Sequence, residues 1–327
     1  MATQRKWNKA VADMLSALKG AGSIALMAHV SPDGDTLGSV LALRLALKKL
    51  GKEVAVFCQH PVPQMLMFME GAEEVLPPDR LAEKVFDLAV AVDVADIGRM
   101  GDCRAVFERA QANAQIDHHD TNPGYAQVNL VDSQACATGE IVYELIGKMG
   151  LDVDKEMAIC LYTALSTDTG NFSFDNTTAK AFTIMSKLMA CGLPLNRLNR
   201  ILFRLRSREQ AKLLARALSS LAFYEDDQIS GMRLSLKDFE ECEALPEHAE
   251  AIVNFAMDII GVQMAFFCRE TKSGGIKVSL RALPPSNVAR VAARFGGGGH
   301  ALAAGCTLHT TLDEAARLLV DAMKEEM

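Results

Sequence analysis

Four short segments in the N-terminal half combine aspartate and histidine at spacings that suit cation binding. HVSPDGD places His29, Asp33 and Asp35 close together, and the two carboxylates flank Gly34, so one loop could turn both toward one point. Carboxylate oxygens and imidazole nitrogens together suit Mn²⁺, Mg²⁺, Co²⁺ or Zn²⁺ better than a soft thiolate site would. An aspartate-rich turn with a helix cap at Asp35 explains the same segment without a metal.

The other three segments each add further ligands. Asp93 ends the apolar run AVAVDV, where a carboxylate is costly to bury unless it is paired or metal-bound. Asp117, His118 and His119 form DHH, and Asp168 follows an apolar helical run in STDTG. Capping aspartates, with one buried and one exposed histidine, are the alternative explanation. Together the segments supply at least six nitrogen and oxygen ligands, enough for the two-cation apparatus of in-line attack on phosphorus.

The C-terminal half carries a different pattern, which indicates anion binding. RFGGGGHALAAG contains Gly297, Gly298 and Gly299 followed by His300, and glycine lets backbone N–H groups approach an anion closely. A helix stop or a flexible tip explains the glycines equally well. The motif lacks the G-K-[ST] ending of a P-loop and the spacing of a dinucleotide fingerprint.

Basic residues also gather in this half, against a single acid, between positions 269 and 294. They are Arg269, Lys272, Lys277, Arg281, Arg290 and Arg294. In KVSLRAL, Ser279 and Arg281 alternate with apolar residues and therefore share one strand face, from which Arg281 could grip a phosphate bidentately. Solvated surface charge is the alternative for Arg269 and Lys272.

Strand-like and helical patterns alternate around these motifs. Strands are predicted at 23–29, 53–58, 87–94 and 111–118, helices at 36–51, 139–150 and 156–170, and a short strand at 172–174. This alternation predicts an α/β fold with a parallel sheet covered by helices. Since ligands bind at the carboxyl ends of such strands, the polar clusters after three of them are expected to converge.

The chain is long enough for two domains. We expect an N-terminal domain at 1–192, a helical linker at 193–222 and a smaller α/β domain at 223–327, with the active-site cleft between them. The smaller domain is predicted to have strands at 229–236, 262–268 and 276–282, and helices near 246–258, 287–295 and 311–325.

Composition narrows the classes of function. A net charge of −7 argues against a protein that coats long nucleic acid, although a short anionic ligand remains compatible. Eight scattered cysteines without a C-x-x-C pair favour reduced thiols and a cytoplasmic protein. We expect no membrane partner, because the sequence shows neither a signal peptide nor an apolar run of about 20 residues.

In their order along the chain, these motifs resemble those of the DHH phosphoesterase superfamily. HVSPDGDTLGS, DVAD, DHH and STDTGNFSF match its four N-terminal motifs, while KVSLR and GGGGHALAAG look like the DHH-associated C-terminal domain. The compact two-domain form is most similar to NrnA-type oligoribonucleases (nanoRNases). Members of that group also act on 3′-phosphoadenosine 5′-phosphate (pAp), and some act on cyclic dinucleotides or their linear products. Cys136 departs from the pattern, which favours a small hydroxyl residue there.

The resemblance implies a role for each site residue. One metal would be bound by His29, Asp33 and Asp93. A second metal would be bound by Asp35, Asp93, His118 and Asp168. Asp93 would thus bridge the metals, His119 would face the scissile phosphate, and Asp117 would orient the histidine pair. The substrate would be held by Ser279, Arg281, Gly297, Gly298, Gly299 and His300.

The resemblance also implies an activity: two-metal hydrolysis of short oligoribonucleotides to mononucleotides, of pAp to AMP, or of both. Mn²⁺ is favoured because two imidazoles take part, with Mg²⁺ or Co²⁺ as alternatives. There are four competing hypotheses. The protein could instead be a phosphodiesterase for cyclic di-AMP or linear pApA, a manganese-dependent pyrophosphatase, a catalytically inactive nucleotide sensor, or a processive exonuclease on long strands. A homodimer is expected by analogy alone.

Overall fold

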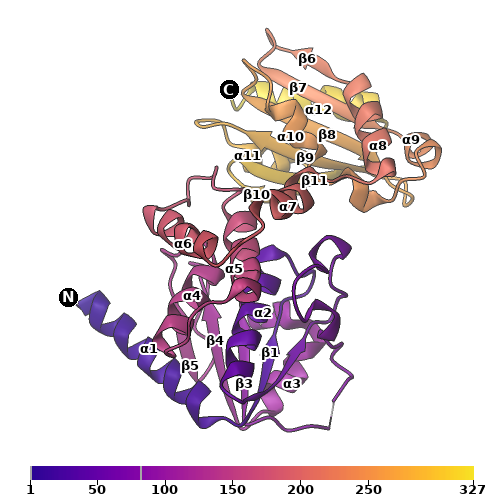
Figure 1. Cartoon of the computed structure of the whole chain (residues 1–327). Coiled ribbons are helices and arrows are strands. Elements are labelled where there is room, and N and C mark those ends of the chain that lie inside the picture. Colours follow the sequence, from indigo (N-terminus) through magenta and orange to yellow (C-terminus); the bar gives the residue numbers. More distant parts are fainter. Residues whose placement is uncertain (1, 82) are drawn as a thin grey trace. The chain divides into compact units, whose positions relative to one another are not determined.

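The computed structural model describes residues 2–81 and 83–327, and it divides into two compact units (Figure 1). The N-terminal unit is Met1–Leu205 and the C-terminal unit is Arg206–Met327. The division falls inside the segment 193–222, for which the sequence predicts a linker. Part of that segment is helical in each unit, as α7 (Leu195–Asn199) followed by a π-helical turn (Arg200–Arg204), and as α8 (Arg208–Ser219).

A five-stranded parallel sheet organises the N-terminal unit and confirms the predicted fold class. Its strands are β1 (Ser23–Met27), β2 (Glu53–Phe57), β3 (Leu88–Val92), β4 (Ala112–Asp117) and β5 (Val128–Val131), in the order β2-β1-β3-β4-β5. The strand β3, LAVAV, is buried along its whole length, as expected for a parallel strand covered on both faces. The sequence did not predict β5.

The sheet is covered by α1 (Ala2–Gly20), α2 (Gly34–Lys49), α3 (Arg104–Arg109) and α4 (Thr138–Lys148). Two further helices, α5 (Lys155–Asp168) and α6 (Ala179–Ala190), pack mainly on other helices. Short 3₁₀ turns lie at Gln64–Leu66, Ala72–Glu74 and Ile97–Cys103. The helices α2, α4 and α5 pack against one another. The beginning of α2 and the end of α5 carry the motif residues Asp35 and Asp168, and the beginning of α4 contacts Asp35, so this packing brings three segments of the site together.

Small residues let these three helices approach at backbone distance. A Cβ on Gly139 would lie 2.5 Å from the Cβ of Ala164, and one on Gly38 would lie 2.8 Å from the amide nitrogen of Ala164. Real Cβ atoms do not come this close to other atoms, so α2 and α4 depend on glycine where they cross α5. These glycines therefore fix how near Asp35 and Thr138 come to Asp168.

We expect Gly38→Ala to lower the free energy of unfolding by about 1–3 kcal/mol, because the new methyl group meets rigid backbone. The matched control is Gly147→Ala in α4, where an added Cβ meets no atom within 4 Å. That variant should be neutral or more stable by up to about 1 kcal/mol, since alanine favours helix. Urea unfolding of both variants tests this, and equal midpoints would contradict the close-packing argument.

The C-terminal unit contains a six-stranded sheet in the order β10-β11-β9-β8-β7-β6. The strands are β6 (Ala222–Tyr224), β7 (Ile229–Leu234), β8 (Met264–Glu270), β9 (Ile276–Ala282), β10 (Gly298–His300) and β11 (Ala303–Leu308). All neighbouring pairs are antiparallel except β7 and β8. The helices are α9 (Leu236–Glu241), α10 (Ile252–Met257), α11 (Val288–Arg294) and α12 (Leu312–Lys324), with a 3₁₀ turn at Pro246–Ala249.

Two local predictions were wrong. The segment 172–174 forms turns instead of a strand, because Asn171 and Phe172 have positive φ and the amide of Ser173 bonds back to the carbonyl of Thr169. The helix predicted near 246–258 is interrupted at Glu250 and Ala251, where Ala251 adopts a left-handed conformation with φ 60°.

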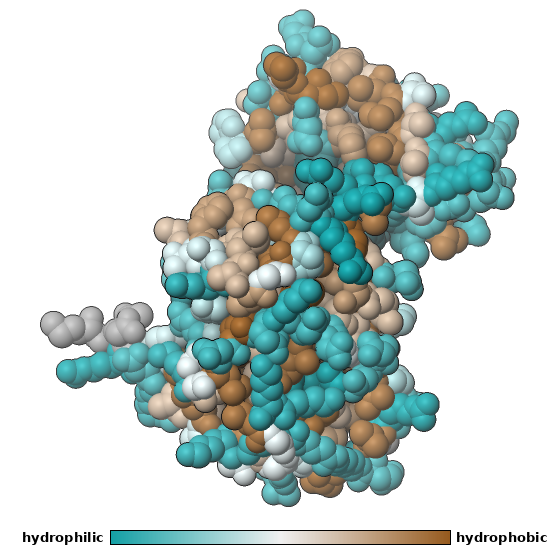
Figure 2. Space-filling model, viewed as in Figure 1, coloured by the Kyte–Doolittle hydropathy of each residue, from teal (hydrophilic) through white to brown (hydrophobic). Residues whose placement is uncertain are grey.

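Much of the surface in view is hydrophilic, with apolar atoms over α6 among the exceptions (Figure 2). There Phe182 is 55% exposed and Met189 is 42% exposed. None of the helices in residues 2–81 and 83–327 is long and apolar enough to cross a membrane.

Candidate metal centre

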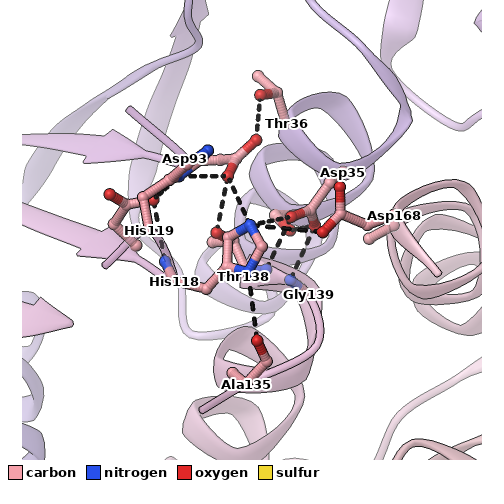
Figure 3. A network of polar contacts seen from close by, with 12 residues as sticks. Asp35, Thr36, Asp93, His118, His119, Ala135, Thr138, Gly139 and Asp168 are labelled. Atoms are coloured by element: carbon pink, nitrogen blue, oxygen red, sulfur yellow. Dashed lines mark hydrogen bonds and ion pairs between the residues drawn. The ribbon is translucent and has the colours of Figure 1, made fainter. Parts of the chain in front are cut away.

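The predicted ligands of the N-terminal unit converge at the carboxyl ends of β1, β3 and β4. Three groups of side chains bring their ligand atoms within 4.8 Å of one another. They are His29 with Asp33 and Asp93, Asp35 with His118 and Asp168, and Asp93 with His118 and His119. Figure 3 shows the carboxylates of Asp93, Asp35 and Asp168 around the ring of His118. The structure thus brings together side chains that are far apart in the sequence.

Asp93 is shared between the groups, with one oxygen on each side. Its Oδ2 lies 3.7 Å from Nε2 of His29, while its Oδ1 lies 3.8 Å from Nε2 of His118. The residue is 2% exposed and has φ 61°, a left-handed conformation that is uncommon outside glycine. Such strain, roughly 1–3 kcal/mol, is typical of functional positions held in place by their surroundings.

The spacings among these atoms fit cation ligands better than hydrogen bonds. His118 Nε2 lies 3.4 Å from Asp168 Oδ2 and 3.8 Å from Asp35 Oδ2, and His29 Nε2 lies 3.6 Å from Asp33 Oδ2. Hydrogen bonds to nitrogen are typically about 2.7–3.2 Å long. Two bonds of about 2.1 Å to one shared cation span at most about 4.2 Å. The donor set therefore fits divalent cations.

Charge in the cluster leads to the same conclusion. Burial, followed by the charges of Asp93 and Asp168, raises the pKa of Asp35 well above its ordinary value. Burial and the charge of Asp33 raise the pKa of Asp93, and burial is also the main reason that the pKa of Asp168 is raised to about 6. Carboxylates that are held together against burial and mutual repulsion are stabilised by cations.

His29 and Asp33 have hydrogen-bond partners that offset the effect of burial on their pKa values. Burial would lower the pKa of His29, but the neighbouring Asp33 carboxylate and Val30 carbonyl raise it. Burial would likewise raise the pKa of Asp33, but His29 and the Thr36 amide lower it. Asp33, and not Asp35, is the cap of α2, because its Oδ1 accepts a hydrogen bond from the Thr36 amide at 3.0 Å. Asp35 lies within the first turn of α2 and is 1% exposed.

Two threonines that the sequence did not single out hold the carboxylates in position. The hydroxyl of Thr36 donates to Asp93 Oδ2 at 2.5 Å, and the hydroxyl of Thr138 donates to Asp93 Oδ1 at 2.9 Å. The amides of Thr138 and Gly139 donate to the two oxygens of Asp35 at 2.7 and 3.0 Å. Since Thr138 begins α4, the positive end of a helix also faces Asp35.

We expect Thr138→Val to weaken Mn²⁺ binding roughly 10–100-fold, as for other residues that orient metal ligands. Valine keeps the shape and the backbone amide but loses the donor to Asp93. Thr138→Ser keeps the hydroxyl and is the matched control, with an affinity near that of the wild type. Calorimetric titration with Mn²⁺ measures both, and an equal loss in the two variants would contradict an orienting role for the hydroxyl.

The adjacent histidines are held by different partners. His118 Nδ1 donates to the carbonyl of Ala135 at 3.2 Å, which turns Nε2 toward the carboxylates of the cluster. His119 Nδ1 donates to Asp117 Oδ1 at 2.8 Å, and this hydrogen bond is the main reason that the pKa of His119 is raised. Asp117 also accepts a bond from the amide of His118, so one buried carboxylate orients both residues. The two rings meet edge to face, 4.7 Å apart.

Asp117 is itself fixed from behind by an amide network. Asn122 donates to Asp117 Oδ2 at 2.5 Å and to the carbonyl of Val94, and it exchanges hydrogen bonds with the buried Gln115. At Cys136 the thiol is buried, and burial together with Glu140 raises its pKa well above the ordinary value. Cys136 belongs to none of the ligand groups described above.

In the C-terminal unit, the residues predicted to hold substrate are aligned across three strands. Ser279 of β9 pairs with Gly305 of β11, which pairs with Gly298 of β10. Two residues further along β9, Arg281 pairs with Ala303 of β11, which pairs with His300 of β10. Residues directly opposite across strands share a face of the sheet. Gly298 and Gly299 therefore lie in an exposed edge strand, and small residues of β11 separate them from Ser279 and Arg281. Gly297 lies outside this strand, and its amide donates to the carbonyl of Ala292 in α11 at 2.9 Å.

A cavity of about 290 Å³ lies beside this row, lined in part by Arg269, Lys277, Ser279 and Arg281. The Arg281 guanidinium is half-buried and donates one hydrogen bond, to the carbonyl of Leu280 at 2.9 Å. Phe295, at the end of α11, packs against the apolar core of the unit.

Comparison with known proteins agrees with this geometry. Residues 23–165 match the model of the DHH family, N-terminal domain, and residues 241–327 match the DHHA1 domain. The chain is 35% identical over 329 residues to the "Bifunctional oligoribonuclease and PAP phosphatase NrnA" of Thermus thermophilus, covering 99% of this chain and 96% of that one. The chain belongs to the DHH family.

Two other DHH relatives extend the comparison. A Bacillus subtilis protein with the same name as the Thermus relative is 27% identical over 307 residues, which cover 91% of this chain and 93% of that protein. The crystal structure of an exopolyphosphatase-related protein from Bacteroides fragilis is 28% identical, with a TM-score of 0.88, and the match covers 97% of this chain and 96% of that one. This DHH protein therefore shares its architecture with a solved structure over nearly its whole length.

Proposed function

We propose that the chain is a two-metal phosphoesterase that hydrolyses short oligoribonucleotides to mononucleotides, pAp to AMP, or both. The observation that carries this proposal is the buried Asp93, whose two oxygens face separate groups of ligands within one cluster. The names of the Thermus and Bacillus relatives support the choice of substrates.

In this proposal, one cation is held by His29, Asp33 and Asp93. The other is held by Asp35, Asp93, His118 and Asp168. When bound, two such cations supply an acidified water as nucleophile and neutralise charge that develops on phosphorus oxygens. Mn²⁺ is favoured because imidazole nitrogens take part in both sets.

The remaining side chains bind and orient the phosphate. His119 donates from Nδ1 to Asp117, and this bond raises its pKa and so favours the protonated ring, in which Nε2 also carries a proton and can donate to a phosphoryl oxygen. The side chain is 32% exposed. A fixed donor aimed at developing charge costs no reorganisation during the reaction. In the C-terminal unit we assign the remainder of the nucleotide to Ser279, Arg281, Gly297, Gly298, Gly299 and His300.

A substrate panel tests the proposal with Mn²⁺ and Mg²⁺ in parallel, read as phosphate and mononucleotide release. We expect turnover of pAp and of a ribodinucleotide, with a 24-mer slower than a 2-mer. Release from pyrophosphate alone would indicate a pyrophosphatase, and faster cleavage of the 24-mer would indicate a processive exonuclease. Preference for pApA or cyclic di-AMP would identify the dinucleotide phosphodiesterase, and no hydrolysis with metal bound would identify a sensor.

A further inference from the structure

One cationic side chain lies at the edge of the metal cluster without a carboxylate beside it. Arg99 belongs to the turn Ile97–Cys103, which follows β3, and its side chain is exposed. Its Nη2 lies 3.3 Å from Nδ1 of His29. Within residues 2–81 and 83–327, no aspartate or glutamate lies within ion-pair distance of this guanidinium.

The contact between Arg99 and His29 is too close to ignore, but it is not a hydrogen bond that occupies a donor of the guanidinium. His29 Nδ1 lies 2.7 Å from the carbonyl oxygen of Val30, and a carbonyl can accept but not donate. Nδ1 therefore carries the proton, and it cannot also accept one from Arg99. The same tautomer leaves Nε2 of His29 facing Asp33 and Asp93. The guanidinium donors of Arg99 are thus left for another acceptor.

The backbone of Arg99 is fastened to the loops of the site. Its carbonyl accepts a hydrogen bond from the Val30 amide at 2.7 Å, and its amide donates to the carbonyl of Asp96 at 2.9 Å. Asp96 caps the turn through the Gly98 amide, and Gln59 accepts a bond from the amide of Asp102. Because these bonds hold the turn, they fix the position from which the Arg99 side chain extends toward His29, although the side chain itself is solvent-exposed.

The guanidinium of Arg99 adds positive charge beside His29, which is assigned to one of the cations, because the two side chains lie 3.3 Å apart. The four carboxylates of the cluster carry −4, and two divalent cations carry +4, so a loaded cluster is neutral (−4 + 4 = 0). A phosphodiester then adds −1 and a terminal phosphate up to −2, which a nearby guanidinium can offset.

From its position beside the cluster we infer that Arg99 binds the phosphate under attack through the non-bridging oxygens, in addition to His119. The inference rests on the proposed function and adds a residue of the N-terminal unit to it. Guanidinium groups suit this role because their N–H donors match two phosphate oxygens at once. Because the interaction grows with the charge of the phosphate, Arg99 should matter more for pAp than for a dinucleotide.

The test compares Arg99→Gln and Arg99→Lys with Arg104→Gln. Arg104 is an exposed arginine of the next helix, α3, whose Nε is paired with Glu108 at 2.7 Å, and so it is the matched control. We expect Arg99→Gln to lower kcat/KM on pAp roughly 10²–10³-fold, with a smaller loss on a dinucleotide. Arg99→Lys should recover part of the loss, and Arg104→Gln should behave as wild type.

Two binding measurements separate a phosphate contact from a structural role. Mn²⁺ affinity of Arg99→Gln should equal or exceed that of the wild type, since a nearby positive charge has been removed. The affinity of the Mn²⁺-loaded protein for inorganic phosphate should fall at least tenfold. Weaker Mn²⁺ binding, or unchanged kinetics and phosphate affinity, would overturn the inference. If the wild type hydrolysed none of the panel, the proposed function would fail, and phosphate titration would still decide the role of Arg99.

Discussion

Asp93→Asn is expected to lower hydrolysis of any accepted substrate roughly 10³-fold or more, beyond the 10–100-fold typical of residues outside the ligand sphere. Asparagine tolerates the left-handed backbone at this position, and its oxygen can accept from one threonine hydroxyl. It cannot supply an anionic oxygen to each of two cations. Calorimetric titration should therefore show weak or single-site Mn²⁺ binding, whereas two sites are expected in the wild type.

The same substitution should make the metal-free protein more stable. The pKa of Asp93 is raised in the folded state by burial and by Asp33, so its ionised form at neutral pH opposes folding. A neutral amide removes that opposition, and the urea midpoint without metal should rise. Asp96→Asn, at an exposed cap three residues on, is the control for both measurements. Full activity in Asp93→Asn, or two tight Mn²⁺ sites, would refute the shared-carboxylate model.

His118→Ala and His119→Ala are expected to fail in different ways. Loss of His118 removes the nitrogen that faces Asp35, Asp93 and Asp168, so Mn²⁺ affinity and activity should fall together. Loss of His119 removes a donor held by Asp117, so kcat should fall roughly 10²–10³-fold while both cations remain bound.

Metal titration and steady-state kinetics on the same preparations separate the two cases. His309→Ala, an exposed histidine of the C-terminal unit, controls for the loss of an imidazole elsewhere. Equal loss of metal in His118→Ala and His119→Ala would show that both rings are ligands and would end the proposed division of roles. Since Asp93 Oδ1 lies 3.7 Å from His119 Nδ1, that outcome is a real alternative.

The parallel sheet was predictable because its strands are short apolar runs that end in polar clusters. That regularity also predicted the convergence of His29, Asp93 and His118, since carboxyl ends of parallel strands meet at one edge. In contrast, β5 has the sequence VNLV with polar neighbours, too short and too mixed to stand out. The N-terminal helix α1 was not predicted either.

The sequence pattern did not predict the residues that hold the metal-ligating carboxylates in position. Thr36 and Thr138 look like ordinary helix-start residues, and only the packing of α2 and α4 on α5 shows that their hydroxyls meet Asp93. The start of α4 in ATGE could have signalled an anion near the first turn, as at other helix N-termini. Arg99 gave no sequence signal at all, because a single arginine in a turn is most often solvated.

In the C-terminal unit, the sequence singled out the glycine segment but did not predict its secondary structure. A run of four glycines suggests a loop, yet Gly298 and Gly299 extend the sheet as its edge strand. Pairing with β11 was hidden because Ala303, Ala304 and Gly305 have low strand propensity. Close strand contact explains the composition, since a Cβ on Gly299 would lie 2.6 Å from the carbonyl oxygen of Ala303.

The cluster draws on residues from His29 to Asp168, and this spread has a consequence for the newly made chain. During synthesis, β1, β3 and β4 leave the ribosome before α5, so most ligands emerge long before Asp168 can join them. The group that contains Asp168 can be complete only after α5 docks on α2 and α4, whereas the group of His29, Asp33 and Asp93 does not include α5. The two groups of ligands are therefore completed at different times as the chain emerges, and the group that contains Asp168 is completed last.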